Sequence, residues 1–150
     1  MDKRPQVVSA TPSRQVVLFR RVFGPIMLRV GLFAVLEVPG RRTATPLHVT
    51  LAVWDVEGNT YLLSQYGVSD WVRNLRAAGD ATLRRKGHTE AFTAIEVDGD
   101  ERGRVIAAFY AKADRWLKQD FDRLPAAADH PTFRVEPIRS RTGPTHSAES

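Results

Sequence analysis

Apolar and polar positions alternate along much of the chain, which is the pattern of half-buried β-strands. The alternating runs are residues 32–38, 47–54, 60–63, 81–86 and 89–97. Polar turns separate them, at Asp55–Asn59 between the second and third runs and at Gly87-His88 between the last two. In the last run Phe92 and Ala94 fall on one face, whereas Thr93, Ile95 and Val97 fall on the other. The pattern predicts antiparallel strands joined by hairpins.

Two later stretches have helical spacing instead. A short helix is expected after Ser69, whose hydroxyl is predicted to accept an amide of the first turn, and it should stop at Gly79. A longer helix is expected from Asp98 onwards, followed by a last short strand at 132–135. The apolar stripe of this longer helix consists of Val105, Phe109, Ala113 and Trp116, widened by Ile106, Tyr110 and Leu117. Strands in hairpins with helices inserted between them indicate a small β-barrel with helical caps.

The two ends of the chain differ from this middle part. We expect residues 1–13 to be a flexible lead, residues 14–138 to form a single domain, and residues 139–150 to be a flexible tail. Residues 14–29 read as a basic amphipathic helix, because apolar positions recur at helical spacing among four Arg residues. Its apolar stripe either packs over the core or lies on a membrane surface.

Charge and composition narrow the function. The chain has 150 residues, no Cys and a net charge of +5, and its first 50 residues alone carry +6. The missing Cys excludes disulfides and thiolate-bound metals. The basic N-terminal third favours an anionic partner such as a phosphate, an anionic lipid or an anionic cofactor, unless its Arg residues are merely solvated. No apolar run approaches the ~20 residues of a membrane span, and no secretory signal is visible.

No catalytic motif stands out. The sequence lacks a Gly-x-Ser-x-Gly elbow, a Walker loop and a Gly-x-Gly-x-x-Gly turn. Its four His residues have no metal-ligand spacing, so we expect no metal site, and the Arg residues do not interleave with aromatics as in nucleic-acid binding. The four His residues are His48, His88, His130 and His146. A bound cofactor is the most coherent option, because it brings its own chemistry and needs only a pocket and suitable electrostatics.

Several short motifs occur in an order that resembles the deazaflavin-dependent nitroreductase family. They are Gly40-Arg41-Arg42-Thr43, Thr45-Pro46-Leu47, Ser64 on the following strand, and Trp71-x-x-Asn74-Leu75-Arg76-Ala77. The resemblance spans roughly residues 30–137. It implies an α+β, mainly β fold, a split β-barrel of the FMN-binding and pyridoxamine-phosphate-oxidase type with helical caps. It also implies the deazaflavin coenzyme F420 as cofactor, with FMN as the alternative.

The resemblance also implies positions for a cofactor site. Arg41 and Arg42 would face the anionic tail of the coenzyme, where charge-assisted hydrogen bonds are strong, and Thr43 would add a neutral donor. Other residues would line or close the pocket of the deazaflavin ring: Thr45, Pro46, Leu47, His48, Leu63, Ser64, Gln65, Trp71 and Asn74. The alternative for Trp71 and Asn74 is a role in the core and in capping a loop. Tyr66 and Tyr110 are the candidates for a proton donor.

The expected activity is reduction of an electron-poor acceptor, a quinone, a nitro compound or an activated alkene, by a hydride from F420H2. The chain departs from the family pattern in a shorter basic loop before Thr45 and a shorter segment before Trp71. Alternatives are a non-catalytic fatty-acid or lipid carrier of the same fold and an FMN-binding protein. We expect a small-molecule substrate, no nucleic-acid partner, and a cytoplasmic monomer or homodimer, with peripheral contact to the inner membrane face through residues 14–29 as an option.

Overall fold

The computed structural model describes residues 13–14, 17 and 32–138. Six strands form a closed antiparallel barrel in the order β1-β2-β3-β6-β5-β4. The strands are β1 (Phe33–Pro39), β2 (Pro46–Val56), β3 (Asn59–Leu63), β4 (Asp80–Arg85), β5 (His88–Val97) and β6 (Thr132–Pro137). The helices are α2 (Asp70–Ala78), α3 (Gly99–Lys112) and α4 (Arg115–Asp122), with a 3-10 turn η1 at Ala127–Asp129. The predicted α+β, mainly β barrel is confirmed.

Two tight turns set the register of the hairpins. Glu57 and Gly58 between β2 and β3 both have positive φ, 52° and 83°, and Lys86 and Gly87 between β4 and β5 have 53° and 78°. Two successive left-handed residues give the turn whose twist matches that of the flanking strands. The strand alternation predicted from the sequence follows from this register, because each strand has one face toward the barrel interior.

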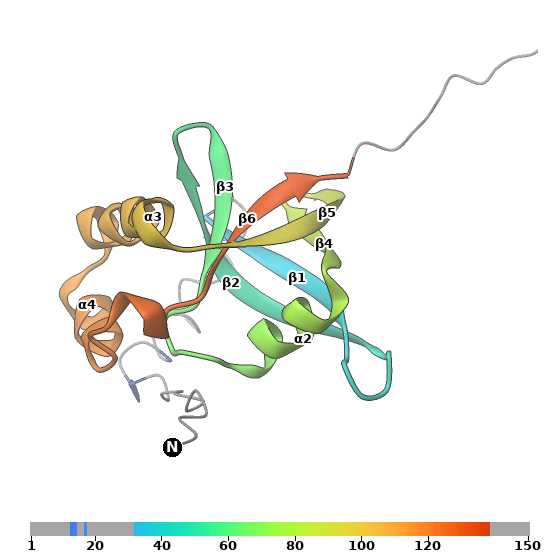
Figure 1. Ribbon diagram of the computed structural model, residues 1–150, viewed down its shortest axis with the longest axis horizontal. Helices are drawn as coiled ribbons and strands as arrows, with labels where there is room; N and C mark the ends of the chain where they lie inside the picture. The colour runs from blue at the N-terminus through green and yellow to red at the C-terminus, as the bar shows by residue number, and fades with distance from the viewer. Residues whose placement is uncertain (1–12, 15–16, 18–31, 139–150) are drawn as a thin grey trace, which may run out of the picture.

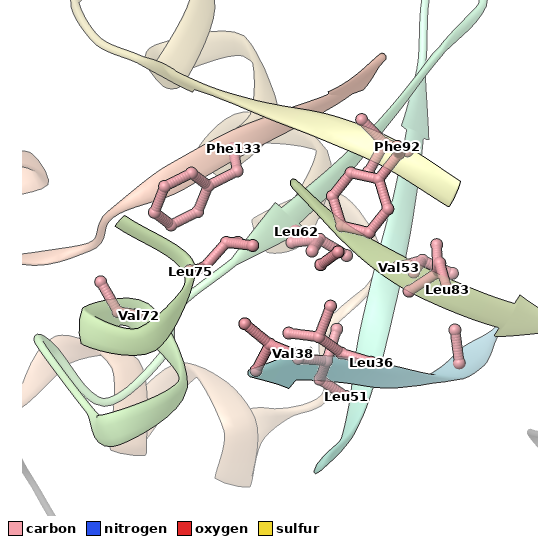
Figure 2. Close-up of a cluster of buried hydrophobic side chains, with 13 residues drawn as sticks. Leu36, Val38, Leu51, Val53, Leu62, Val72, Leu75, Leu83, Phe92 and Phe133 are labelled. Atoms are coloured by element: carbon pink, nitrogen blue, oxygen red, sulfur yellow. The ribbon is translucent and has the colours of Figure 1, made fainter. Parts of the chain in front are cut away.

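The barrel interior is filled from all six strands and from one helix (Figure 2). Leu36 pairs with Val49 on one side and with Leu83 on the other, and all three point inward. Val72 and Leu75 of α2 are fully buried and close one end of the same core. Burying a side chain of this size contributes roughly 1.5–3 kcal/mol. The position of α2 is therefore fixed by its apolar face.

A second apolar cluster lies on the outside of the barrel, where α3 and α4 cover it (Figure 1). Val105 and Phe109 of α3 pack on Tyr61, Leu63 and Val97, which point outward from β3 and β5. Phe109 stacks on Phe121 of α4, with ring centroids 4.6 Å apart. The strands under these helices are therefore buried on both faces.

The prediction of a single long helix from Asp98 is wrong in one respect, because the chain forms two helices there. Ala113 has an extended conformation, with ψ of 143°, and Asp114 begins α4 by accepting a hydrogen bond from the Leu117 amide. The break turns Ala113 and Leu117 toward the barrel, whereas Trp116 is 46% exposed and does not belong to the apolar stripe. A local cap at Asp114 has overridden the continuous helical periodicity.

The predicted helix at residues 14–29 falls almost entirely outside the described part of the chain, as do the expected flexible lead and tail. Arg14 and Val17 are the described positions within it, and both are helical. None of the helices in the described ranges has the length and apolar character needed to cross a membrane.

Candidate cofactor site

The β1–β2 turn and helix α2 meet at a shallow hollow of about 210 Å³. The hollow is lined by Gly40, Arg41, Arg42, Thr43, Leu47, Asp70 and Asn74. These residues come from two segments about 30 positions apart in the chain, which the sequence motifs had suggested would act together. The fold brings them together because β1 ends at the turn and α2 packs against β1.

The turn itself is tightly built. The Gly40 amide donates to the Thr45 carbonyl and the Ala44 amide to the Gly40 carbonyl, both at 2.9 Å. A Cβ on Gly40 would lie 3.3 Å from both Thr43 Oγ1 and the Thr45 carbonyl oxygen. Glycine is therefore favoured here by the lack of room for a side chain.

Arg41 connects the turn to α2. Its backbone amide and its Nη1 both donate to Asn74 Oδ1, at 3.2 and 2.8 Å, and its Nη2 lies 3.5 Å from Asp70 Oδ1. Asn74 is 3% exposed, so its amide oxygen is reserved for Arg41. Asn74 thus caps a loop, as the alternative reading proposed, and in doing so it holds the basic turn beside the helix.

The charges around the hollow favour an anion. Arg42 is exposed and makes no hydrogen bond or ion pair with any residue in the described ranges. Arg73 lies 3.8 Å from Asp70, the one acidic residue that lines the hollow. Arg41 and Arg73 therefore both lie near the Asp70 carboxylate, and Arg42 lines the same hollow, at the N-terminal end of α2 where the helix dipole adds positive potential.

Ser69 is the N-cap residue of α2, as predicted, but its hydroxyl makes no capping hydrogen bond. Its Oγ is buried and has no hydrogen-bond partner in the part of the chain that the structure describes. A buried hydroxyl without a partner is costly. Ser69 precedes Asp70 in the chain but is not itself among the residues that line the hollow.

Strand β2 has an unpaired edge next to the hollow. It pairs with β1 from Pro46 to Ala52, but with β3 only from Val53 to Val56. The edge that faces away from β1 thus has no strand partner over residues 46–52 among the described elements. Backbone amides and carbonyls on such an edge need other partners. Leu47, which faces the barrel interior at this end, is 46% exposed. An apolar side chain beside free backbone donors and acceptors suits the face and edge of a flat polar ring.

The other predicted ring-pocket residues are distributed around this edge. Thr45 and Pro46 are exposed at its start, and Trp71 packs against Phe133 with centroids 6.0 Å apart. His48 lies on the opposite face of β2 from Leu47, and its Nε2 is 2.7 Å from Glu37 Oε2. Leu63 is buried under α3 and α4. The structure therefore does not bring His48 and Leu63 to the hollow at Arg41.

Ser64 and Gln65 begin the loop that leads to α2, and both are buried. Ser64 is held by its surroundings, because its hydroxyl donates to the Gly67 carbonyl and its amide to the Pro131 carbonyl. Gln65 Oε1 is buried without a partner in the described chain. Ser64 thus shapes the loop, whereas Gln65 has an acceptor without a partner among the described residues.

His130 anchors this loop and is a residue that the sequence analysis treated only as a non-ligand. It is fully buried, with Nδ1 2.8 Å from the Ser64 carbonyl oxygen and Nε2 2.6 Å from the Leu124 carbonyl oxygen. Its ring stacks on Phe121 at 3.5 Å. A single His near a Pro, as in His130-Pro131, gives no sequence signal of such a role, because the role depends on how the fold places Ser64 and the C-terminal end of α4 around the ring.

The two candidate proton donors lie in different surroundings. Tyr66 follows Gln65 in the loop, and its hydroxyl lies 3.3 Å from Oδ2 of the buried Asp120. Tyr110 packs edge-on against Phe109 and Phe121 in the cluster between α3 and α4. No group of acidic, His or Cys residues suited to a metal ion occurs in the described ranges.

The sequence profile of the F420H(2)-dependent quinone reductases matches residues 13–120. The chain belongs to this family. It is thus an oxidoreductase of a family that depends on F420H2, as the resemblance implied. The matched region contains the basic turn, β2 and α2, so it covers the whole of the hollow described above. The comparison with curated proteins found no match.

Solved structures agree on the fold of this family member. An F420-H2 dependent reductase, FDR-A, superposes with a TM-score of 0.52 at 20% identity and covers 70% of this chain and 94% of its own. A putative 5-nitroimidazole antibiotic resistance protein from Bacteroides thetaiotaomicron gives 0.55 at 12% identity, with 80% of each chain covered. The heme storage protein HutZ of Vibrio cholerae gives 0.55 at 14% identity, covering 87% of this chain and 92% of its own. At these identities the likeness establishes the split-barrel fold.

Proposed function

We propose that the protein reduces a quinone with F420H2 and holds the coenzyme between the β1–β2 turn, the unpaired edge of β2 and the N-terminus of α2. When bound, the reduced coenzyme supplies a hydride, which is two electrons and one proton. The acceptor takes this hydride and one further proton, so that a quinone becomes a hydroquinone. The protein's part is to bind both molecules, orient them and exclude water.

The observation that carries this proposal is the joining of the basic turn to α2 by Arg41 and Asn74. It places the exposed Arg42 beside the N-terminus of a helix, where an anionic coenzyme tail gains charge-assisted hydrogen bonds. The residues present therefore fit the anionic part of F420.

The ring of the coenzyme is assigned to the edge of β2. The backbone groups of residues 46–52 would bind its polar edge, and Leu47 and Trp71 would contact its faces. Of the two tyrosines, we retain Tyr66 as the candidate proton donor, because it follows Gln65 in the loop beside this edge. The assignment of Thr45 and Pro46 to the same wall follows from their exposure at the start of β2.

A direct test uses the purified protein and three ligands. Reduced F420, FMN and a medium-chain fatty acid are titrated separately, and oxidation of F420H2 is then followed after addition of menadione, a nitroaromatic compound or a cyclic enone. The proposal predicts micromolar or tighter binding of F420H2 and the highest kcat/KM with menadione. Binding of the fatty acid or FMN without binding of F420H2 would replace the proposal by one of those alternatives.

A further inference from the structure

A second hollow, of about 250 Å³, lies between the barrel and the junction of α3 and α4. Its wall includes Phe33, Ala52 and Val53 from the strands and Ala113 and Leu117 from the helices, and it is predominantly apolar. This volume is slightly below the usual range of ligand pockets, roughly 300–1,000 Å³. It suits a small ring system better than a long-tailed lipid.

Two buried polar atoms belong to side chains that line this hollow. They are Trp54 Nε1, a donor, and Gln65 Oε1, an acceptor, and neither has a hydrogen-bond partner within the described residues. Gln65 is 6% exposed. Leaving such groups unpaired costs about 1–3 kcal/mol each. A ligand that accepts from the indole and donates to the amide would remove both costs.

The positive and negative charges of the residues that line this hollow cancel. Arg85 donates to both carboxylate oxygens of Asp55, at 3.0 and 2.6 Å, and the positive charge of Lys112 is balanced by the negative charge of Asp114. The hollow at Arg41 and Arg42 has, by contrast, an excess of positive charge. The two hollows therefore differ in the charge of the ligand that each favours, an anion at the first and a neutral molecule at the second.

The second hollow adjoins the proposed coenzyme edge along the chain. Ala52 is the last residue of β2 without a partner on its second edge, and it also lines this hollow. Gln65, at the start of the loop to α2, lines it too. A molecule held here would lie next to β2 and the loop to α2, which border the proposed coenzyme site.

We propose that this hollow binds the acceptor, a neutral cyclic carbonyl compound of the quinone class, with Trp54 and Gln65 as its orienting residues. The inference rests on the proposed function. The indole N–H donates to a carbonyl oxygen of the quinone. After reduction, a hydroxyl of the hydroquinone donates to Gln65 Oε1. Trp54 can thus donate to an oxygen of either form of the ligand, whereas the Gln65 acceptor is satisfied only by the reduced form.

The test of this pocket needs no coenzyme. Menadione, a bicyclic quinone without a tail, is titrated into the full-length protein while the three indole N–H signals are followed by NMR, with Trp54→Phe used to assign the Trp54 signal. We expect the Trp54 signal to shift in a saturable manner. Ala52→Leu, whose larger side chain would fill part of the pocket, should weaken this binding at least fivefold. An unchanged Trp54 signal at saturating menadione, or equal binding by folded Ala52→Leu, would overturn the inference.

A kinetic measurement separates this inference from the proposed function. With F420H2 saturating, Trp54→Phe should raise the KM for menadione about 2- to 10-fold, as expected for one lost hydrogen bond, and leave the Kd of F420H2 unchanged. Trp116→Phe is the matched control, because Trp116 is exposed on α4. An active Trp54→Phe enzyme with unaltered KM would contradict the acceptor pocket alone. Failure of the wild-type protein to bind F420H2 would contradict the proposed function, while the NMR titration still decides the pocket.

Discussion

Nη1 of Arg41 lies 2.8 Å from Oδ1 of Asn74, although the two residues are 33 positions apart in the chain. The same oxygen also accepts the backbone amide of Arg41. One buried amide oxygen therefore fixes both the main chain and the side chain of the basic turn. This contact is what converts two separate sequence motifs into one hollow.

Removal of this contact should affect both stability and binding. In Asn74→Ala, two donors of Arg41 lose their acceptor, and we expect the free energy of unfolding to fall by about 1–3 kcal/mol. The turn would also lose its fixed position, so the affinity for F420H2 should fall. Urea unfolding and fluorescence titration measure the two effects. Gln119→Ala, at an exposed position of α4, is the control that should change neither.

Replacement of Asp70 should strengthen the binding of F420H2, which is the opposite of the effect expected for Asn74→Ala. The Asp70 carboxylate lies near the guanidinium groups of Arg41 and Arg73 and lines the hollow proposed for an anion. Asp70→Asn removes a repulsive charge, so F420H2 should bind about 1.5- to 5-fold more tightly, the range expected for one exposed charge pair. Asp122→Asn, an exposed acidic residue on α4, should leave the Kd unchanged. Weaker binding by Asp70→Asn would show that the coenzyme tail lies elsewhere.

The pH dependence of stability should report on Glu101. Hydrogen bonds from Arg134 and then from Tyr61 hold the pKa of Glu101 below its ordinary value of 4.5. Because the folded-state pKa is the lower one, the stabilisation is complete above about pH 4.5 and is lost as the pH falls toward the folded-state pKa. Glu101→Gln should therefore be less stable than the wild type at pH 7, with the difference narrowing below pH 4.

The control for this measurement is Glu90→Gln, since Glu90 is exposed on β5. The free energy of unfolding of Glu90→Gln should stay close to that of the wild type across the same pH range. A Glu101→Gln difference that stayed constant down to pH 3 would indicate that the Glu101 carboxylate does not stabilise the fold through its charge.

His130 should be a major contributor to stability. Replacement by Phe retains an aromatic ring against Phe121 but leaves the carbonyls of Ser64 and Leu124 without their partner. A neutral imidazole has one N–H and donates to one of these two carbonyls, so we expect a loss of about 1–3 kcal/mol for that hydrogen bond. Thermal and urea unfolding would measure it, with His88→Phe at the exposed start of β5 as the control. Equal stabilities of the two variants would rule out the anchoring role of His130.

The barrel was predictable from the sequence because strand alternation and turn chemistry are local signals. Phe92 and Ala94 share one face as expected, and that face points inward. Glu57-Gly58 and Lys86-Gly87 supply the left-handed turns, the second one residue earlier than the predicted Gly87-His88. The break of the long helix at Ala113 was missed, because the apolar stripe continues through it in sequence. Only the cap at Asp114 and the packing of Leu117 show where the helix must change direction.

The candidate site was predictable to a lesser extent. The motifs predicted that Arg41, Arg42 and Asn74 belong to one site, and all three line the same hollow. The motifs did not predict how Asn74 holds Arg41. Leu63 and Ser64 are neighbours in sequence and face different environments, because β3 ends at Leu63 and Ser64 begins the loop to α2. The unpaired Trp54 Nε1 and Gln65 Oε1 could not be foreseen, because a missing partner is a property of the folded chain.

The most direct test of the central claim is the Kd of F420H2 for Arg42→Gln beside that for Arg84→Gln. Both Arg residues are exposed, but Arg84 lies on the outer face of β4, away from the hollow. A lost charge-assisted hydrogen bond of about 1.5 kcal/mol predicts a Kd raised about tenfold in Arg42→Gln, and no change in Arg84→Gln. Equal Kd values for both variants and the wild type would contradict the assignment of the coenzyme tail to the β1–β2 turn.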